Sequence, residues 1–345
     1  MIKHFGYICI LVLSLYGCEK QPQEFKHSIL KFGTIIDITL YDVDADLAQR
    51  AFDDLDHDFA YYHAAWTPYE ASSLSRINLL IPTGKPFSVG PSVLPLITNS
   101  MPLAEATDDL YNPTIGKLIK LWQMHRSEEP GIHPPAPEKI AELVKQNPRL
   151  SDLHLDGIRM YSDNPAVELN FGAYAKGYGI DLSMAHLREL GIKNAIINTG
   201  GDLKAMGQHG DRPWNIAIRH PRKDTVLASV TTQGEEAVFT SGDYERYYMY
   251  EGKRYHHILD PRTGYPAMGT QSVTVIHQDS GLADASATAL FVAGPDHWFE
   301  VAKKIGLKMV MLVDDEGKIH ITPQMKQRLK FNPDIETTLI VSPEL

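Results

Sequence analysis

The stretch KRYHHILDPRTGYP, which covers residues 253–266, leads two adjacent histidines from a predicted strand directly into a turn. The Asp-Pro and Thr-Gly pairs that follow are typical turn residues, so the strand ends just after the histidines. Side chains alternate along a strand, and His256 and His257 must therefore face opposite sides of the sheet. The two imidazoles cannot share one role: one is expected at the strand end, where sites form, and the other in the core or at an edge.

Outside this stretch, helical and strand-like patterns are mixed without regular alternation. This mixture predicts an α+β fold rather than a doubly wound parallel sheet. Strands are expected over residues 28–40 (two strands or one bent strand), 153–155, 158–161, 167–169, 195–198, 214–219, 227–232, 237–240, 247–250, 254–258, 272–277 and 308–313. Helices are expected over residues 44–62, 92–107, 113–122 with Asn112 as cap, 138–147, 173–190, 284–293 and 298–305, and residues 72–78 are expected to form a short helix or a turn.

The composition is that of an ordinary globular protein. The chain has 345 residues, of which 43% are hydrophobic and 22% charged, which is enough for one large domain or two intimate halves. A formal net charge of −10 and the lack of any run of lysine and arginine argue against nucleic-acid binding. An anionic ligand would therefore have to be held by local donors or by a metal.

The N-terminal residues predict export and membrane anchoring. Lys3 precedes an apolar run that has the length of a signal-peptide core and is too short to span a bilayer. The run ends in Leu-Tyr-Gly-Cys18, which resembles the lipobox of bacterial lipoproteins. We therefore expect residues 1–17 to be a signal peptide, Cys18 to be lipidated, and residues 18–27 to tether a folded domain of residues 28–345. An ordinary cleaved signal with an incidental cysteine is the alternative.

The sequence DASAT, which begins at Asp284, predicts a metal site. On a helix, residues four apart share a face, so the Asp284 carboxylate and the Thr288 hydroxyl would present two oxygen atoms to one point. Oxygen ligands of this kind suit magnesium, which completes its shell with phosphate oxygens and water. The alternative is that Asp284 caps the helix and Thr288 packs in the core.

The sequence NFGAYAKGYG, residues 170–179, predicts a phosphate-binding loop. It follows a predicted strand and opens a helix, where free backbone N–H groups can bind phosphate. The order Lys176-Gly-Tyr fits neither a Walker A loop nor a Rossmann fingerprint. Lys176 could place a positive charge on a diphosphate, or it could be a solvated surface lysine. The chain also has no Gly-x-Ser-x-Gly elbow and no His-Glu-x-x-His spacing, which disfavours a serine hydrolase and a zinc enzyme.

Taken in order, the motifs resemble the ApbE family of FAD:protein FMN transferases over nearly the whole mature chain. The matching segments are residues 33–34, 72–78, 111–116, 172–177, 198–202, 240–246, 257–264 and 283–288. The resemblance implies an α+β fold of two interlocked T-fold-like halves that form one compact unit. It also implies a lipoprotein anchored to the bacterial inner membrane and facing the periplasm.

The resemblance implies an activity and a set of site residues. A threonine hydroxyl of a target flavoprotein would attack the FMN-side phosphorus of FAD, with magnesium bound, and AMP would leave. Magnesium would be held by Asp284, Thr288 and the carbonyl of Ala173, and Lys176 and Asn170 would lie near the nucleotide. The residues implied to contact the flavin or adenine are Phe32, Trp66, Leu110, Tyr111, Asn112 and His257, and His257 would also be the base.

The implied acceptors are subunits of membrane redox complexes, such as the sodium-pumping NADH:quinone oxidoreductase and the Rnf complex. The chain departs from the family pattern at Asn112, where the family usually has aspartate, and at Asn170, a position that is often acidic. Three alternatives stay open: an FAD pyrophosphatase in which water replaces threonine, a flavin-binding lipoprotein without turnover, and a structural lipoprotein.

Overall fold

The computed structural model describes residues 23–124 and 132–345, and one large sheet runs through it. The strands of this sheet are β1 (Glu24–Lys31), β2 (Thr34–Tyr41), β6 (Ala195–Thr199), β7 (Asp202–Met206), β12 (Glu236–Gly242), β15 (Thr270–His277), β16 (Val310–Asp314), β17 (Ile319–Ile321) and β19 (Leu339–Val341). Its nine strands lie in the order β1-β2-β6-β7-β12-β15-β16-β17-β19. Neighbouring strands are antiparallel, except that β19 pairs parallel to β17.

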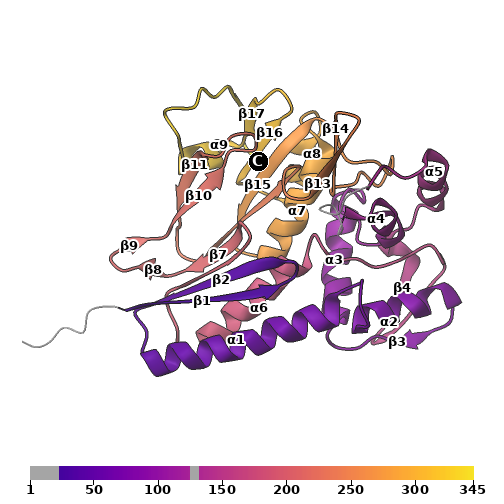
Figure 1. Cartoon of the computed structure of the whole chain (residues 1–345), viewed down its shortest axis with the longest axis horizontal. Helices are drawn as coiled ribbons and strands as arrows, with labels where there is room; N and C mark the ends of the chain where they lie inside the picture. The colour runs from indigo at the N-terminus through magenta and orange to yellow at the C-terminus, as the bar shows by residue number, and fades with distance from the viewer. Residues whose placement is uncertain (1–22, 125–131) are drawn as a thin grey trace, which may run out of the picture.

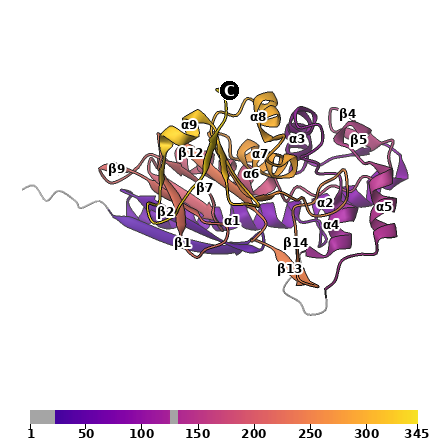
Figure 2. The same cartoon turned by 90° about the horizontal axis from the view of Figure 1, so that it is seen from above.

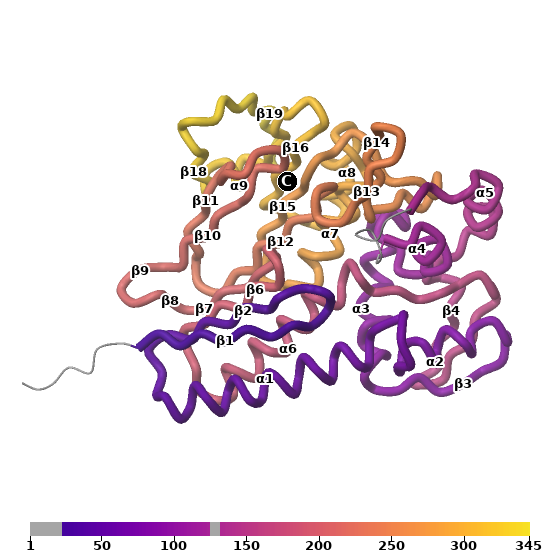
Figure 3. Tube along the Cα trace, viewed as in Figure 1, coloured from indigo at the N-terminus to yellow at the C-terminus, as the bar shows by residue number. Residues whose placement is uncertain are grey.

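The sheet and its helices repeat one arrangement. The first half runs β1, β2, helix α1 (Ala45–Trp66), helix α6 (Ala175–Glu189), β6 and β7. The second half runs β12, β15, helix α7 (Ser280–Ala293), helix α8 (Trp298–Ile305), β16 and β17. The halves join where β7 pairs with β12 and where α6 packs against α7, as the chain trace in Figure 3 shows. The predicted α+β fold of two interlocked halves is confirmed.

An insertion between α1 and α6 forms a lobe at one end of the molecule (Figure 1). It contains α2 (Ser73–Leu80), a 3-10 turn (Ile81–Thr83), β3 (Phe87–Ser88), α3 (Leu94–Ala106), α4 (Gly116–Trp122), α5 (Pro137–Gln146), a second 3-10 turn (Leu150–Asp152), β4 (Leu153–Asp156) and β5 (Arg159–Ser162). Its three strands make a small sheet in the order β3-β5-β4. This lobe supplies the residues that precede α6.

The remaining elements lie outside the two halves and the insertion. They are β8 (Gln208–His209), β9 (Arg212–Pro213), β10 (Asn215–Arg219), β11 (Val226–Thr231), β13 (Tyr247–Tyr250), β14 (Lys253–His256), α9 (Pro323–Arg328) and β18 (Leu329–Phe331). A three-stranded sheet, β10-β11-β18, packs over a second apolar core. Strands β13 and β14 form a separate hairpin that projects from the body of the molecule in Figure 2.

Apolar patterning explains why these segments take these positions. In β2, Ile36, Ile38 and Leu40 alternate with more exposed residues and are buried against the helices. Strands β15 and β16 are buried at nearly every position, because helices cover one face and the smaller sheet covers part of the other. Helix α7 is likewise buried almost all round.

Several predicted boundaries were wrong. Helix α4 begins at Gly116 rather than after an Asn112 cap, because residues 114–116 form backbone hydrogen bonds with Glu168. The predicted strand at residues 167–169 is reduced to the single bridge between Ile115 and Glu168. Helix α1 continues to Trp66, whose buried ring packs on the core.

The folded region also starts earlier than expected, because β1 begins at Glu24 and pairs with β2. Residues 24–27 of the predicted tether are therefore part of the sheet. The predicted signal peptide and Cys18 lie outside the described residues, and lipidation stays a prediction. No helix within residues 23–124 and 132–345 combines the length and apolar character that crossing a membrane requires.

Candidate active site

The predicted site residues of α6 and α7 meet where the two halves join. The backbone N–H of Gly177 donates to the Asp284 carboxylate at 3.3 Å, which links the start of α6 to the interior of α7. The Thr288 hydroxyl shares a hydrogen bond of 3.1 Å with Ser241 at the end of β12. Sequence elements that are more than a hundred residues apart therefore border one site.

Glycine allows this close contact between the two helices. A Cβ atom on Gly177 would lie 2.2 Å from the Ser280 carbonyl oxygen, so only glycine fits without displacing backbone. Asp181 of α6 adds a second link, because its carboxylate accepts hydrogen bonds from the N–H and the hydroxyl of Ser280, both at 2.8 Å. Because Gly177 donates to Asp284, no backbone N–H of the described residues donates to the Ala173 carbonyl. The Ala173 carbonyl oxygen can therefore bind another partner.

The helix-cap alternative for Asp284 was wrong. Asp279 caps α7 by accepting a hydrogen bond from Leu282 N, and Asp284 lies in the second turn. Within residues 283–293, Thr288 is the single residue that is not fully buried. Thr288 therefore reaches solvent on the same helical face as Asp284.

The charges at this point favour a bound cation. Burial raises the pKa of Asp284 to about 7, although Lys176 opposes the rise. Lys176 forms an ion pair with Asp202, which the turn after β6 holds in place and which also accepts from Thr240 N at 2.9 Å. Burial opposes the charge of Lys176, but Asp202 and Asp284 outweigh it and raise the pKa of the ammonium. One lysine thus faces two buried carboxylates, and a bound cation would supply the further positive charge that keeps Asp284 ionised.

The donor set decides which cation fits. In the described part of the chain, no group of three His, Cys, Asp or Glu side chains is arranged to hold a metal. A metal here would depend on one carboxylate, one hydroxyl and one carbonyl, from Asp284, Thr288 and Ala173. Mixed oxygen donors with open positions match magnesium, which keeps water and phosphate oxygens in its shell.

The two histidines have different surroundings, as predicted. His256 is buried, donates from Nε2 to the Ala267 carbonyl at 2.8 Å and packs edge-on against Phe291, so it is a core histidine. His257 is half-buried, and its Nδ1 lies 3.3 Å from the Arg246 carbonyl. A carbonyl can only accept, so Nδ1 carries the proton and Nε2 is the basic nitrogen.

The protonation state of His257 follows from its neighbours. Burial lowers its pKa well below 6.5, and the positive charges of Arg246 and Lys176 lower it further. The imidazole is therefore neutral near pH 7 and can accept a proton. Lys176, which pairs with Asp202, is therefore close enough to His257 for its charge to act on the imidazole.

Arg246 is a residue to which sequence reasoning assigned no role. Its side chain reaches solvent, yet the surrounding protein partly desolvates the guanidinium and lowers its pKa. Across residues 23–124 and 132–345, no carboxylate forms an ion pair with it. An unpaired guanidinium beside His257 is suited to phosphate. The TSGDYER motif contains it, but spacing alone cannot show what it faces.

The predicted loop residue Asn170 shapes the start of α6. Its Oδ1 accepts a hydrogen bond from Gly172 N at 2.9 Å, and its Nδ2 donates to the Tyr69 hydroxyl at 3.4 Å. Tyr69 also acts on the Arg246 guanidinium, whose pKa it raises against the lowering by burial. Asn170 therefore connects the glycine loop to Tyr69.

The predicted pocket-lining residues fall into three groups. Phe32, at the tip of the β1–β2 hairpin, is partly exposed and stacks on Trp66, with ring centroids 6.2 Å apart. Trp66 is buried, stacks on Tyr62 at 4.7 Å and donates from Nε1 to Ser92 O, so it supports Phe32 from below. Leu110 and Tyr111 form the second group, and both are buried in the main core.

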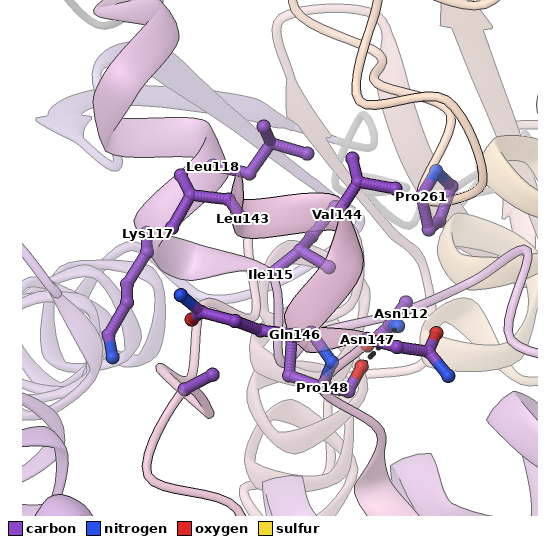
Figure 4. A pocket seen from close by; sticks show the side chains of 11 residues that line it. Asn112, Ile115, Lys117, Leu118, Leu143, Val144, Gln146, Asn147, Pro148 and Pro261 are labelled. Carbon is purple, nitrogen blue, oxygen red and sulfur yellow. Dashed lines mark hydrogen bonds between the residues drawn. The ribbon is translucent and has the colours of Figure 1, made fainter. Parts of the chain in front are cut away.

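Asn112 is the third case, because it borders a separate recess between α4, α5 and Pro261 (Figure 4). Its Nδ2 donates to the Pro148 carbonyl at 2.9 Å, and its Oδ1 accepts from Thr114. The recess has a volume of about 20 Å³, which is room for a water molecule and not for a flavin ring. The structure thus brings Lys176 close to Asp284, on the helical face that also carries Thr288, and the charge of Lys176 reaches His257. The side chain of Asn112 bonds instead to Pro148 and Thr114.

Comparisons with known proteins agree with this geometry. Residues 32–311 match the model of the ApbE family. The FAD:protein FMN transferase of Rhodobacter capsulatus is 37% identical over 87% of this chain, and the chain spans 57% of that relative's length. The enzyme of the same name from Vibrio cholerae is 29% identical over 91% of this chain and 96% of its own length.

Solved structures show the same fold. The ApbE protein from Thermotoga maritima superposes with a TM-score of 0.80 at 30% identity, covering 89% of this chain and 99% of that one. The flavin transferase ApbE from Vibrio cholerae superposes with a TM-score of 0.78 at 26% identity, over 89% and 99% of the two chains.

Proposed function

The chain belongs to the ApbE family, and we propose that it is an FAD:protein FMN transferase. It would transfer the FMN moiety of FAD to a threonine hydroxyl of an acceptor flavoprotein and release AMP. The observation that carries this proposal is the meeting of a buried carboxylate, a lysine and a neutral imidazole at the junction of α6 and α7. The names of the matched relatives support flavin transfer as the chemistry.

Different residues would serve the two main requirements of phosphoryl transfer, which are positioning of the reactants and neutralisation of charge. Asp284, Thr288 and the Ala173 carbonyl would hold magnesium, which when bound neutralises charge on the diphosphate oxygens. Lys176 and Arg246 would add positive charge on the side of the cleft that His257 borders. The half-exposed ring of Phe32 offers an aromatic face for the flavin or the adenine.

His257 would act as the general base. The Arg246 carbonyl orients the ring through Nδ1, so Nε2 is free to take the proton of the threonine hydroxyl. The threonine oxygen would form a bond to the FMN-side phosphorus while the bond from that phosphorus to the bridging oxygen breaks. The electron pair of the broken bond would leave with AMP, and FMN would stay on the protein as a phosphoester.

The test uses the purified chain with FAD, magnesium and a candidate acceptor protein. Yellow fluorescence on the acceptor in a denaturing gel, together with released AMP, is the expected result. Release of AMP and free FMN without labelled protein would instead identify a pyrophosphatase. Tight FAD binding without AMP would identify a flavin-binding protein, and no FAD binding would leave a structural lipoprotein.

We also propose that the protein is anchored by a lipid on Cys18 to the periplasmic side of a bacterial inner membrane. The support is the apolar run that ends in a lipobox-like sequence. Acceptors in membrane redox complexes of the NADH:quinone oxidoreductase or Rnf type would be accessible from there. Metabolic labelling of cells with a palmitate analogue should mark the protein, and Cys18→Ala should remove the label.

A further inference from the structure

The β13–β14 hairpin carries a cluster of exposed apolar side chains. In the four-residue strand β13, Tyr247, Met249 and Tyr250 are 37%, 56% and 39% exposed, and only Tyr248 is buried. Single exposed apolar residues are ordinary on protein surfaces, but three in one short strand make a patch. We call these three residues the hairpin patch.

Aromatic stacking fixes the hairpin to the rest of the protein, so its exposed side chains have a defined position. Tyr248 stacks on Tyr255 with centroids 5.6 Å apart, and Tyr255 stacks on the buried Trp122 at 5.7 Å. On the opposite face, the Arg254 guanidinium lies 4.4 Å over the ring of Tyr247. The side that carries Tyr248 is therefore anchored in the small core beside α4. Tyr250 lies on that same side at the tip of the hairpin, with its ring centroid 6.4 Å from that of His133, whereas Tyr247 and Met249 face the other side.

The hairpin patch is joined directly to the proposed base. His257 is the first residue after β14, and its N–H donates to the Arg246 carbonyl, just before β13, at 3.1 Å. Tyr247 pairs with His256 in the hairpin register. The backbone hydrogen bonds of the hairpin therefore fix the distance between the hairpin patch and the imidazole of His257.

We propose that the hairpin patch is the surface on which an extended segment of the acceptor protein docks, with apolar side chains of that segment next to the hydroxyl residue. This inference rests on the proposed function, because only a protein acceptor, and not FAD alone, needs a docking surface of this kind. Among the described residues, β13 pairs only with β14, so its outer edge keeps backbone groups that an extended segment can bond.

The position of the patch favours this occupant over others. A hydroxyl that reaches Nε2 of His257 must come on a chain that passes over the residues bordering that imidazole, and the hairpin is such a border. A second copy of this protein, or a lipid surface, seated on the patch would obstruct that approach. These two occupants are separable from an acceptor segment by experiment.

The test compares the double variant Met249→Ser/Tyr250→Ser with the wild-type enzyme. Tyr247 stays in place so that its contact with Arg254 is kept. The KM for the acceptor protein should rise at least about fivefold, while the FAD dissociation constant and kcat at saturating acceptor stay unchanged. The matched control is Leu79→Ser/Ile158→Ser, which removes two apolar side chains of the insertion that are 78% and 57% exposed. An acceptor KM that rises equally in both double variants, or in neither, would overturn the proposal.

A second measurement does not depend on the stability of a variant. A photo-crosslinking phenylalanine analogue placed at position 249 of the full chain should capture the acceptor near its modified hydroxyl residue. Crosslinks only to another copy of the enzyme, or only to lipid in phosphatidylglycerol vesicles, would refute the docking role. Failure of the proposed function is distinguishable, because the wild-type enzyme would then transfer no flavin to any acceptor.

Discussion

Replacing Gly177 by alanine should separate α6 from α7. The new Cβ would lie 2.2 Å from the Ser280 oxygen, 2.5 Å from the Ser280 carbonyl carbon and 2.8 Å from Gly281 N. All three atoms belong to the backbone, so no side chain can rotate away. Restoring ordinary contact requires the helices to move apart by roughly 1 Å, which lengthens the 3.3 Å hydrogen bond from Gly177 to Asp284.

The expected change in the free energy of unfolding of Gly177→Ala is the sum of opposing contributions. Forcing extra volume into a packed contact costs about 1–3 kcal/mol, and losing the hydrogen bond costs about 1 kcal/mol more. Alanine regains about 1 kcal/mol through its higher helix propensity. The free energy of unfolding should therefore fall by about 1–3 kcal/mol in Gly177→Ala.

Gly179→Ala is the matched control, because it lies on the same helix and has the same gain in helix propensity. Its Cβ would lie 3.4 Å from the nearest atom, on the Trp66 ring, so it should be neutral or stabilising. Urea unfolding monitored by circular dichroism measures both variants, and a magnesium titration of flavin transfer should show a higher requirement for Gly177→Ala alone. Equal stability and equal magnesium dependence in the two variants would refute the close helix contact as a requirement of the site.

Four further predictions concern the charged residues. Asp284→Ala should abolish magnesium-dependent transfer, and a variant that still responds to magnesium would remove Asp284 from the mechanism. His257→Ala should slow transfer about a hundredfold or more while FAD affinity, measured by fluorescence titration, changes little. Arg246→Met removes a positive charge that lowers the pKa of His257, so that pKa rises and the acid limb of the pH–rate profile should move to higher pH; an unmoved limb would contradict this coupling. Asp181→Ala leaves the buried N–H and hydroxyl of Ser280 without their acceptor, so thermal unfolding should show a loss of about 1–3 kcal/mol, and an unchanged melting temperature would argue against this link.

Local patterns in the sequence determined much of this protein. The alternation in residues 34–41 placed Ile36, Ile38 and Leu40 inward, because side chains of a strand alternate whatever the partner strand is. The spacing of Asp284 and Thr288 put both on one helical face for the same kind of reason. The opposite surroundings of His256 and His257 also followed from strand geometry.

Only the tertiary structure decided which distant groups meet. Lys176 pairs with Asp202 through the order of strands in the sheet and the packing of the halves, which no local period encodes. The same holds for Asn112, whose motif suggested a ligand contact but whose amide bonds to Pro148. The local periodicity of the sequence determines which face of its helix or strand a residue occupies. Which residue it contacts there depends on the packing of segments that lie far apart in the chain.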